Sequence, residues 1–176
     1  MSMYFNKNNK GFSLIEVMVT LVILMTGLLG LAGLQGKAYT SQAESYQRSQ
    51  ALTLLKDMAS RLNANRSNSS SYKTTSPLGV GSGTCTSTNT ITTDLCEWDS
   101  ALKGSAEGTT AGAMVGARGC ITELASTLPK KYLIAVVWQG LTPTTASAVT
   151  CGQNSYGSND ALRRVMTIPV TIAKLN

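Results

Sequence analysis

The chain has 176 residues, a formal net charge of +6 and no histidine. This length fits one domain. The lack of histidine removes the commonest general base, the usual base partner of a nucleophilic serine or cysteine, and every zinc site that needs imidazole. The nine carboxylates show no EF-hand spacing. We therefore predict a protein that is not an enzyme, with no catalytic residues, no metal and no cofactor.

The positive charge is mild and spread along the chain. The basic doublets are Lys130-Lys131 and Arg163-Arg164, which we expect at solvated strand ends. Binding of single-stranded nucleic acid needs a basic stripe interleaved with aromatic side chains, and only the segment Lys130 to Tyr132 approaches that pattern. No nucleic-acid partner is therefore expected.

The first 34 residues contain a short basic leader and then a long apolar run. The leader carries Lys7 and Lys10 and ends at Gly11, and the apolar run covers about 23 residues, from Phe12 to Leu34. At a rise of ~1.5 Å per residue, a helix of this length crosses the ~30 Å hydrocarbon core of a bilayer. The lysines before the run predict that the N-terminus stays in the cytoplasm.

One carboxylate, Glu16, lies inside the apolar run. A charged side chain at membrane depth costs roughly 2.5–3.5 kcal/mol on insertion scales, and such residues usually have a functional partner. A secretory signal peptide does not explain the pattern, because its apolar region has about 7–15 residues and is followed by a site of small residues. A plain membrane anchor explains the length and the lysines, but neither Glu16 nor the Gly11-Phe12 junction.

The helical pattern continues beyond Leu34 and becomes amphipathic. Asp57 and Arg61 form an i,i+4 pair on one face. Apolar residues at steps of three and four predict a packed stripe on another face, made of Leu52, Leu55, Ala59 and Leu62. No proline interrupts the chain from Phe12 to Asn65, so we predict one helix that ends near residue 65.

A second, short helix is expected after a polar stretch. Residues 67–93 are rich in Ser, Thr, Gly and Asn and are predicted to form a surface loop. Asp94, with Glu97 three residues later, has the spacing of a capping box, which predicts Asp94 as the N-cap. Gly104 can end this helix. Its apolar face would consist of Leu95, Trp98 and Leu102.

The last third predicts antiparallel strands at residues 117–124, 132–139 and 162–172. The second strand is apolar on both alternating faces and is expected to be central. In the third strand Arg164 is the exception on an otherwise apolar face of Leu162, Met166, Ile168, Val170 and Ile172. Pro169 cannot donate to a ladder, which predicts an edge strand or a bulge. The expected fold class is α+β, with a long N-terminal helix packed on a small antiparallel sheet.

The four cysteines are expected to form disulfides, because none has the CxxC spacing of a metal or redox motif and the topology is that of an exported protein. They are Cys85, Cys96, Cys120 and Cys151. Four cysteines allow three connectivities, and the sequence alone does not fix one. If the first two strands form a hairpin about Pro129, Cys120 lies at the end of the sheet from which the 140–160 segment starts. This arrangement favours a Cys120–Cys151 bridge and leaves Cys85 with Cys96.

The basic leader, the Gly11-Phe12 junction and Glu16, in that order before an apolar helix, resemble the processing signal of type IV prepilins and pseudopilins. The resemblance implies that a membrane prepilin peptidase cuts after Gly11 and N-methylates Phe12. It also implies that Glu16 meets the amine of Phe12 on a neighbouring subunit. The chain would then consist of a leader, 1–11, a transmembrane half-helix, 12–34, and a head outside the cytoplasm, 35–176, that includes the second half of the helix.

Further motifs narrow this resemblance. The Trp138–Leu141 segment, Cys151-Gly152 and Arg163-Arg164-Val165 look like parts of the type IV pilus modification proteins, a group of minor pilins. Major pilins usually close the head with one C-terminal disulfide loop, whereas four cysteines are present here. The resemblance therefore implies a minor pilin that helps to initiate pilus assembly and to present the tip complex, in surface attachment and twitching motility.

Two other functions carry the same processing signal. One is a minor pseudopilin of a type II secretion system, and the other is a DNA-uptake or adhesive tip module. The partners implied are other minor pilins, the major pilin, the prepilin peptidase, the inner-membrane assembly platform and, as a further candidate, a tip adhesin. The protein is expected as a single-pass inner-membrane protein before assembly, and afterwards in the pilus at the cell surface.

Overall fold

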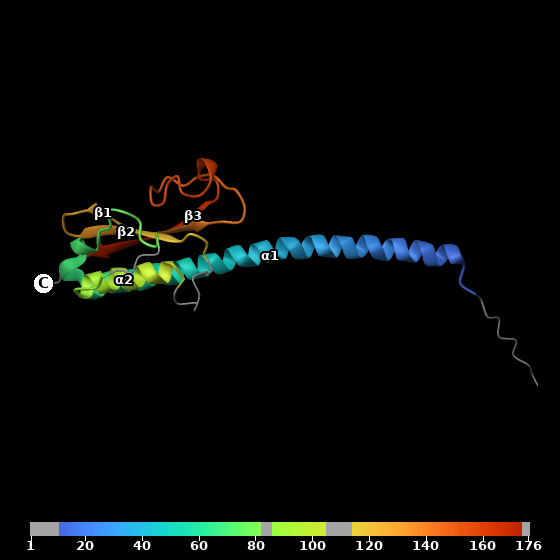
Figure 1. Ribbon diagram of the computed structural model, residues 1–176, viewed down its shortest axis with the longest axis horizontal. Coiled ribbons are helices and arrows are strands. Elements are labelled where there is room, and N and C mark those ends of the chain that lie inside the picture. The colour runs from blue at the N-terminus through green and yellow to red at the C-terminus, as the bar shows by residue number, and fades with distance from the viewer. Residues whose placement is uncertain (1–10, 82–85, 105–113, 174–176) are drawn as a thin grey trace, which may run out of the picture. The chain divides into compact units, whose positions relative to one another are not determined.

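The structure is a computed structural model that describes residues 11–81, 86–104 and 114–173. The elements along the chain are α1 (Leu14–Ala64), η1 (Arg66–Tyr72), α2 (Thr90–Leu102), β1 (Arg118–Ala125), β2 (Lys130–Gln139), η3 (Ser158–Asp160) and β3 (Arg163–Ile172) (Figure 1). The chain divides between Ser41 and Gln42 into two compact units. The first contains the N-terminal part of α1, and the second, here called the C-terminal unit, contains the rest of α1 and all other elements. The expected α+β class is confirmed.

The C-terminal unit is built on a three-stranded antiparallel sheet of order β1-β2-β3. The strand β2 is central, as expected from its two apolar faces. The strand β3 lies at an edge and contains Pro169, as expected from the missing N–H of proline. The other edge, β1, is partly covered by an antiparallel bridge between Leu78 and Gly119.

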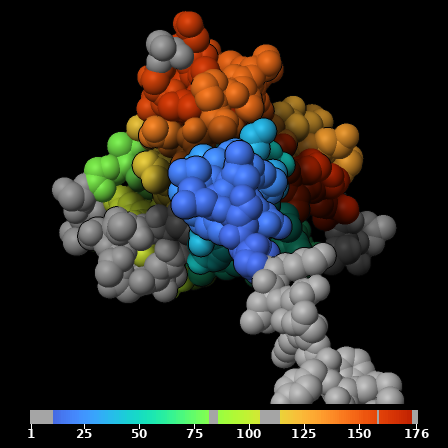
Figure 2. Space-filling model, turned by 90° about the vertical axis from the view of Figure 1, so that its right-hand side faces the viewer, coloured from blue at the N-terminus to red at the C-terminus, as the bar shows by residue number. Residues whose placement is uncertain are grey.

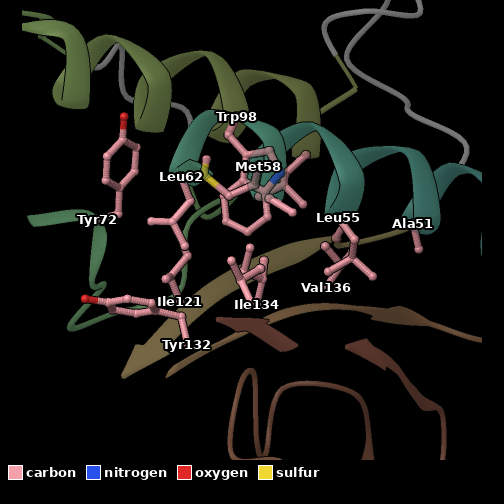
Figure 3. Packing of buried hydrophobic residues seen from close by; sticks show 14 of the residues in the cluster. Ala51, Leu55, Met58, Leu62, Tyr72, Trp98, Ile121, Tyr132, Ile134 and Val136 are labelled. Atoms are coloured by element: carbon pink, nitrogen blue, oxygen red, sulfur yellow. The ribbon is translucent and has the colours of Figure 1, made fainter. Parts of the chain in front are cut away.

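One face of the sheet packs against α1 and α2, and these contacts form the main core (Figure 3). The side chains of β2 that face the helices are Tyr132, Ile134, Val136 and Trp138, all buried. In α1 the buried positions are Gln47, Ala51, Leu55, Met58, Ala59 and Leu62. Their spacing of three and four residues places them on one face of the helix, which is why this half of α1 is amphipathic.

The expected stripe on α1 is wrong at Leu52, which is 40% exposed. The helix turns about 100° per residue, so Leu52 points well away from its neighbour Ala51, which is fully buried. Met58, which the predicted stripe did not include, is fully buried.

The opposite face of the sheet is covered by the segment from 140 to 160, which forms one lobe of the surface, coloured orange in Figure 2. The buried residues of this smaller core are Ala135, Val137, Cys151 and Tyr156. Cys120 on β1 and Cys151 in the lobe form a disulfide, which is one of the two bridges expected. The other expected bridge includes Cys85, which lies outside the described residues, so that pairing stays a prediction.

The start of the second helix was predicted wrongly. The helix α2 begins at Thr90, and its N-cap is Asn89, not Asp94. The Asn89 side chain accepts the N–H of Thr92 at 3.0 Å, and the Thr92 hydroxyl accepts the N–H of Asn89 at 2.9 Å. This reciprocal pair satisfies N–H groups at the start of the helix, so Asp94 lies inside the first turns. The stretch 67–93 is therefore not one loop, since it contains η1 and the start of α2.

The end of α2 follows the sequence pattern. Gly104 has φ +86°, a left-handed conformation that glycine adopts without steric cost, and its N–H donates to the Ala101 carbonyl at 3.0 Å. The third strand shows one more difference. Leu162 precedes β3 and packs in the smaller core, whereas Met166, Ile168, Val170 and Ile172 face the main core.

Candidate functional site

The Gly11-Phe12 junction lies just before α1 and has no packed neighbours among the described residues. The Ser13 carbonyl accepts the N–H of Glu16 at 3.0 Å, which begins the helix. Phe12 is 84% exposed, and nothing lies within 4 Å of the place that a Cβ on Gly11 would take. A peptidase can therefore reach the bond between Gly11 and Phe12 without unfolding a packed region.

Glu16 lies in the first turn of α1, and its side chain is exposed. The partial positive charge at a helix N-terminus favours a carboxylate at this position. Among the described residues, the ion pairs involve other carboxylates and not Glu16. The described residues thus give Glu16 no ion-pair partner, and a neighbouring molecule is one source of a group that would offset its charge in an apolar environment.

The N-terminal part of α1 has an apolar surface. The best window of 18 residues has a mean hydropathy of 2.4, so the helix is long and apolar enough to cross a membrane by length and composition. The hydroxyls of Thr20 and Thr26 donate to carbonyls of the same helix, at 2.8 Å to Val17 and 2.9 Å to Ile23. These polar groups need no partner outside the helix, which suits a hydrocarbon environment.

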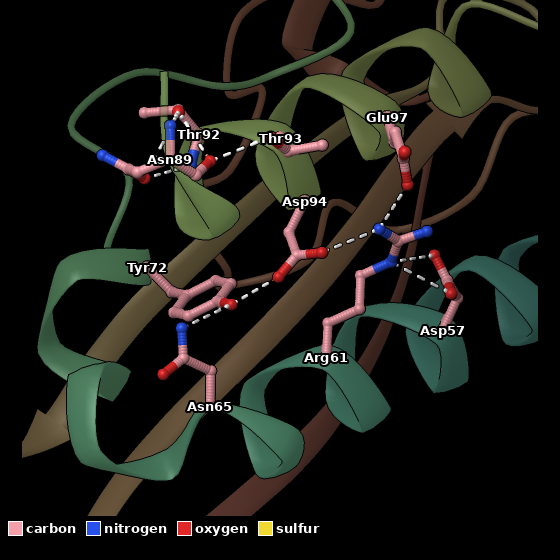
Figure 4. A network of polar contacts seen from close by, with 9 residues as sticks. All are labelled: Asp57, Arg61, Asn65, Tyr72, Asn89, Thr92, Thr93, Asp94 and Glu97. Atoms are coloured by element: carbon pink, nitrogen blue, oxygen red, sulfur yellow. Dashed lines mark hydrogen bonds and ion pairs between the residues drawn. The ribbon is translucent and has the colours of Figure 1, made fainter. Parts of the chain in front are cut away.

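In the C-terminal unit, a polar network joins α1, η1 and α2 around Arg61 (Figure 4). Arg61 bonds to Asp57 Oδ2 at 3.0 Å, to Asp94 Oδ1 at 2.9 Å and to Glu97 Oε2 at 2.6 Å. The expected pair of Asp57 and Arg61 is thus confirmed and is part of a larger cluster. Burial lowers the pKa of Arg61, but the hydrogen bonds to the carboxylates raise it by more.

Tyr72 belongs to the same network. Its hydroxyl donates to Asp94 Oδ2 at 2.5 Å. Burial, and then the hydrogen bond to Asp94, raise the pKa of Tyr72. The Arg61 guanidinium, shared by three carboxylates, and the neutral Tyr72 phenol hold α1, η1 and α2 together. Neither group is an activated nucleophile or base.

Two consecutive arginines fasten the lobe to the rest of the unit. Arg164 donates to Glu44 Oε1 on α1 at 3.0 Å and to the Thr142 carbonyl at 2.6 Å. A hydrogen bond from the Thr142 hydroxyl, and then the Arg164 guanidinium, lower the pKa of Glu44. Arg164 is thus the charged exception on the apolar face of β3 because it reaches a carboxylate on α1.

Arg163 points to the other face of the sheet and is almost fully buried. It donates to the carbonyls of Val149 at 2.5 Å, Cys151 at 2.9 Å and Ser147 at 2.7 Å. Its Nε lies 3.2 Å from Asp160 Oδ2. The pKa of Asp160 is lowered mainly by the hydrogen bond from the Asn154 N–H and further by the charge of Arg163. These bonds fix the lobe that also carries the disulfide.

Within the described part of the chain, no group of three or more Cys, Asp or Glu side chains has a geometry that could hold a metal ion. The expected processing and assembly residues Gly11, Phe12 and Glu16 lie together around the start of α1. Cys120 and Cys151 form their disulfide within the C-terminal unit.

The sequence patterns missed two polar contacts of the core. Gln47 of α1 is buried and accepts the Trp138 indole N–H at 3.1 Å, and Glu44 pairs with Arg164. A buried Trp needs an acceptor for its N–H. Gln47, one turn before Ala51 on the buried face of α1, was therefore a sequence signal for such an acceptor.

Two family models match the chain. The model described as type IV pilin Tt1218 matches residues 33–101, and the model described as the prokaryotic N-terminal methylation motif matches residues 6–32. Together they cover residues 6–101 without a gap. No curated protein and no solved structure matches the chain.

A long apolar N-terminal helix whose second half packs on a three-stranded antiparallel sheet defines a pilin-like α+β protein. Over residues 33–101 the chain is similar to the type IV pilin family, and over residues 6–32 it carries the N-terminal methylation motif. This family is one of structural proteins and not of enzymes.

Proposed function

We propose that the protein is a minor pilin of a type IV pilus, which helps to initiate assembly and to present the tip complex. The observation that carries this proposal is Glu16, an exposed carboxylate in the first turn of an apolar helix, four residues after Phe12. In this proposal a prepilin peptidase cuts after Gly11 and N-methylates Phe12. The new amine of one subunit then pairs with Glu16 of its neighbour. Such a pair offsets part of the cost of a carboxylate in lipid and fixes the register of adjacent helices.

The further partners proposed are the major pilin, other minor pilins, the inner-membrane assembly platform and a tip adhesin. The protein resides first in the inner membrane with its N-terminus in the cytoplasm, and then in the pilus at the cell surface. Within the pilin family we propose the type IV pilus modification protein PilV as the nearest type. The support for this is the Trp138–Leu141 segment, Cys151-Gly152 and the pair of arginines that begins β3.

The test of processing is the mass of the mature N-terminus from membrane or pilus fractions. The expected result is a chain that starts at Phe12 with a methylated amine. A bulkier residue in place of Gly11 is expected to leave an uncut precursor. A mature chain that starts at Met1, or beyond Leu34, contradicts the proposal.

The test of assembly is Glu16→Ala, with Glu16→Gln as a second variant that keeps the size of the side chain. If the helix is only an anchor, loss of this charge should leave membrane insertion unchanged or make it easier. If Glu16 pairs with a neighbour's amine, cleavage and insertion stay intact, while this subunit becomes scarce in sheared surface filaments and the filaments become fewer. Incorporation and piliation equal to the wild type would overturn the assembly role.

The second candidate function is a minor pseudopilin of a type II secretion system, since the same helix and junction serve both machines. Co-purification of the processed protein with pilus or with secretion components distinguishes them. A DNA-uptake module has less support, because Tyr132, the aromatic side chain beside Lys130 and Lys131, is fully buried and cannot stack on a base.

A further inference from the structure

A polar pocket of about 310 Å³ lies between α1, β3 and the lobe. It is lined by Arg48, Thr144, Thr145, Ser147, Val149, Arg163, Arg164, Val165 and Thr167. The proposed assembly role does not use this pocket, and it belongs entirely to the C-terminal unit. Its volume is at the lower end of the range for small-molecule sites, about 300–1,000 Å³.

The pocket is positively charged because one of its three guanidinium groups is not neutralised. Arg163 pairs with Asp160 and Arg164 with Glu44. Arg48 is exposed, and the ion pairs and hydrogen bonds of the described residues do not include it. The pocket therefore has one positive charge in excess.

The described carboxylates of the C-terminal unit do not pair with Arg48. The described carboxylates from Gln42 onward are all held by other cations: Glu44 by Arg164, Asp57, Asp94 and Glu97 by Arg61, Asp99 by Lys103, Glu123 by Lys73, and Asp160 by Arg163. Among the described residues, Arg48 is therefore left to bind an anion from outside the unit. A guanidinium offers two parallel N–H groups that match a carboxylate.

The walls of the pocket are held in place before any ligand arrives. The Arg164 Nη1 donates to Thr144 Oγ1 at 2.6 Å, and the Thr144 N–H donates to the Ala161 carbonyl at 2.7 Å. The bonds of Arg163 to three carbonyls fix the adjoining wall. A pre-formed wall lowers the entropy that is lost on binding.

The rest of the lining indicates what kind of anion fits. Thr145 and Thr167 are exposed at the pocket and bring hydroxyls that both donate and accept hydrogen bonds. Val149 and Val165 are half-buried and give a small apolar surface. A sugar ring has hydroxyls at its edge and C–H groups on its faces, so this combination of groups matches a sugar that carries a carboxylate.

We propose that this pocket binds a sugar acid, with Arg48 holding the carboxylate and the threonine hydroxyls contacting the ring. A protein surface is a poorer match, because the centres of protein interfaces are enriched in apolar and aromatic groups and this lining is mostly polar. A nucleic-acid strand is also a poorer match, since the lining offers no aromatic ring for stacking.

The test uses the full chain in detergent micelles and a ligand-observed NMR titration with glucuronic acid, glucose and acetate. Glucuronic acid is expected to bind more tightly than either of the other two. Arg48→Ala should weaken the binding of glucuronic acid by about tenfold or more, since a charge-assisted hydrogen bond contributes about 1.5–3 kcal/mol. Lys56→Ala is the matched control, because Lys56 is an exposed cation on the same helix that does not line the pocket.

A second variant separates a sugar acid from a bare anion. Thr167→Val keeps the shape of the side chain and removes the hydroxyl, so it should weaken glucuronic acid and leave acetate unchanged. Acetate that binds as tightly as glucuronic acid overturns the sugar ligand and favours an acidic side chain of a protein partner. Absence of saturable binding, or equal affinities for wild type and Arg48→Ala, overturns the site itself.

Discussion

The contact between β1 and α2 depends on one glycine, and Gly119→Ala should therefore destabilise the C-terminal unit. A Cβ on Gly119 would lie 2.3 Å and 2.5 Å from ring atoms of Trp98 and 2.7 Å from Leu102 Cδ1. Both side chains are buried, and protein interiors leave few voids for a displaced side chain. The Trp98 ring is also held by its N–H, which donates to the Leu54 carbonyl at 3.0 Å. One added methyl group must therefore move the ring, the helix α2 or the strand.

The expected cost is about 1–3 kcal/mol from overpacking. A further ~0.5–1.5 kcal/mol is lost if the ring shift breaks the indole hydrogen bond. The assay is denaturation of the full chain in micelles, followed by tryptophan fluorescence. Thr122→Ala, at an exposed position on the same strand, is the control and should change the unfolding free energy by less than ~0.5 kcal/mol.

A double-mutant cycle identifies the cause. In a Trp98→Leu background the clashing ring is absent, so the added cost of Gly119→Ala should fall well below its value in the wild type. Trp138 remains there as the fluorescent probe. If the cost is the same in both backgrounds, or if Gly119→Ala matches Thr122→Ala, the packing argument is wrong.

Three other predictions concern the C-terminal unit. The disulfide joins residues 31 apart in sequence, so Cys120→Ala with Cys151→Ala should lower the unfolding free energy by about 3–4 kcal/mol, measured by denaturation under non-reducing conditions. The pKa of Glu44 is lower in the folded state than its ordinary value of 4.5, so the unfolded state binds the proton first. Stability should therefore fall as the pH drops below about 4.5, and less so in Glu44→Gln, in a series of acid denaturation curves. Burial raises the pKa of Tyr156 from 10.0 to about 12, so stability should fall between these two pH values, and fall less steeply in Tyr156→Phe than in the wild type, measured by thermal melting. Loss of the bond from the Tyr156 hydroxyl to the Gly116 carbonyl, 2.6 Å long, should cost this variant about 1 kcal/mol at neutral pH.

Elements with a long, consistent pattern could be predicted from the sequence. The uninterrupted helix to Ala64, the central position of β2 and the edge position of β3 all follow from local rules about proline and periodicity. In these cases the pattern of a single segment predicts which of its faces is buried. Tertiary contacts then agree with the local preference.

The N-cap of α2 could not be predicted by the same means. The local pattern of Asp94 and Glu97 matches a capping box, but Tyr72 and Arg61 use these carboxylates across 22 to 36 positions of sequence. A spacing rule considers only neighbours along the chain, so it cannot detect that a side chain has a distant partner. Asn89 and Thr92, which do form the cap, have the same type of local pattern in a less familiar pair of residues.

Arg164 and Glu16 present the same anomaly in the sequence, because each is a charge among apolar residues. Arg164 finds its partner within the chain, since its guanidinium lies 3.0 Å from the Glu44 carboxylate on α1. Glu16 has no such partner among the described residues, because their ion pairs do not include it. A charge in an apolar setting is costly whether the setting is a protein core or a lipid phase. The contrast between the two residues is the physical reason to look for the partner of Glu16 on a neighbouring subunit, where processing after Gly11 would create a free amine at Phe12.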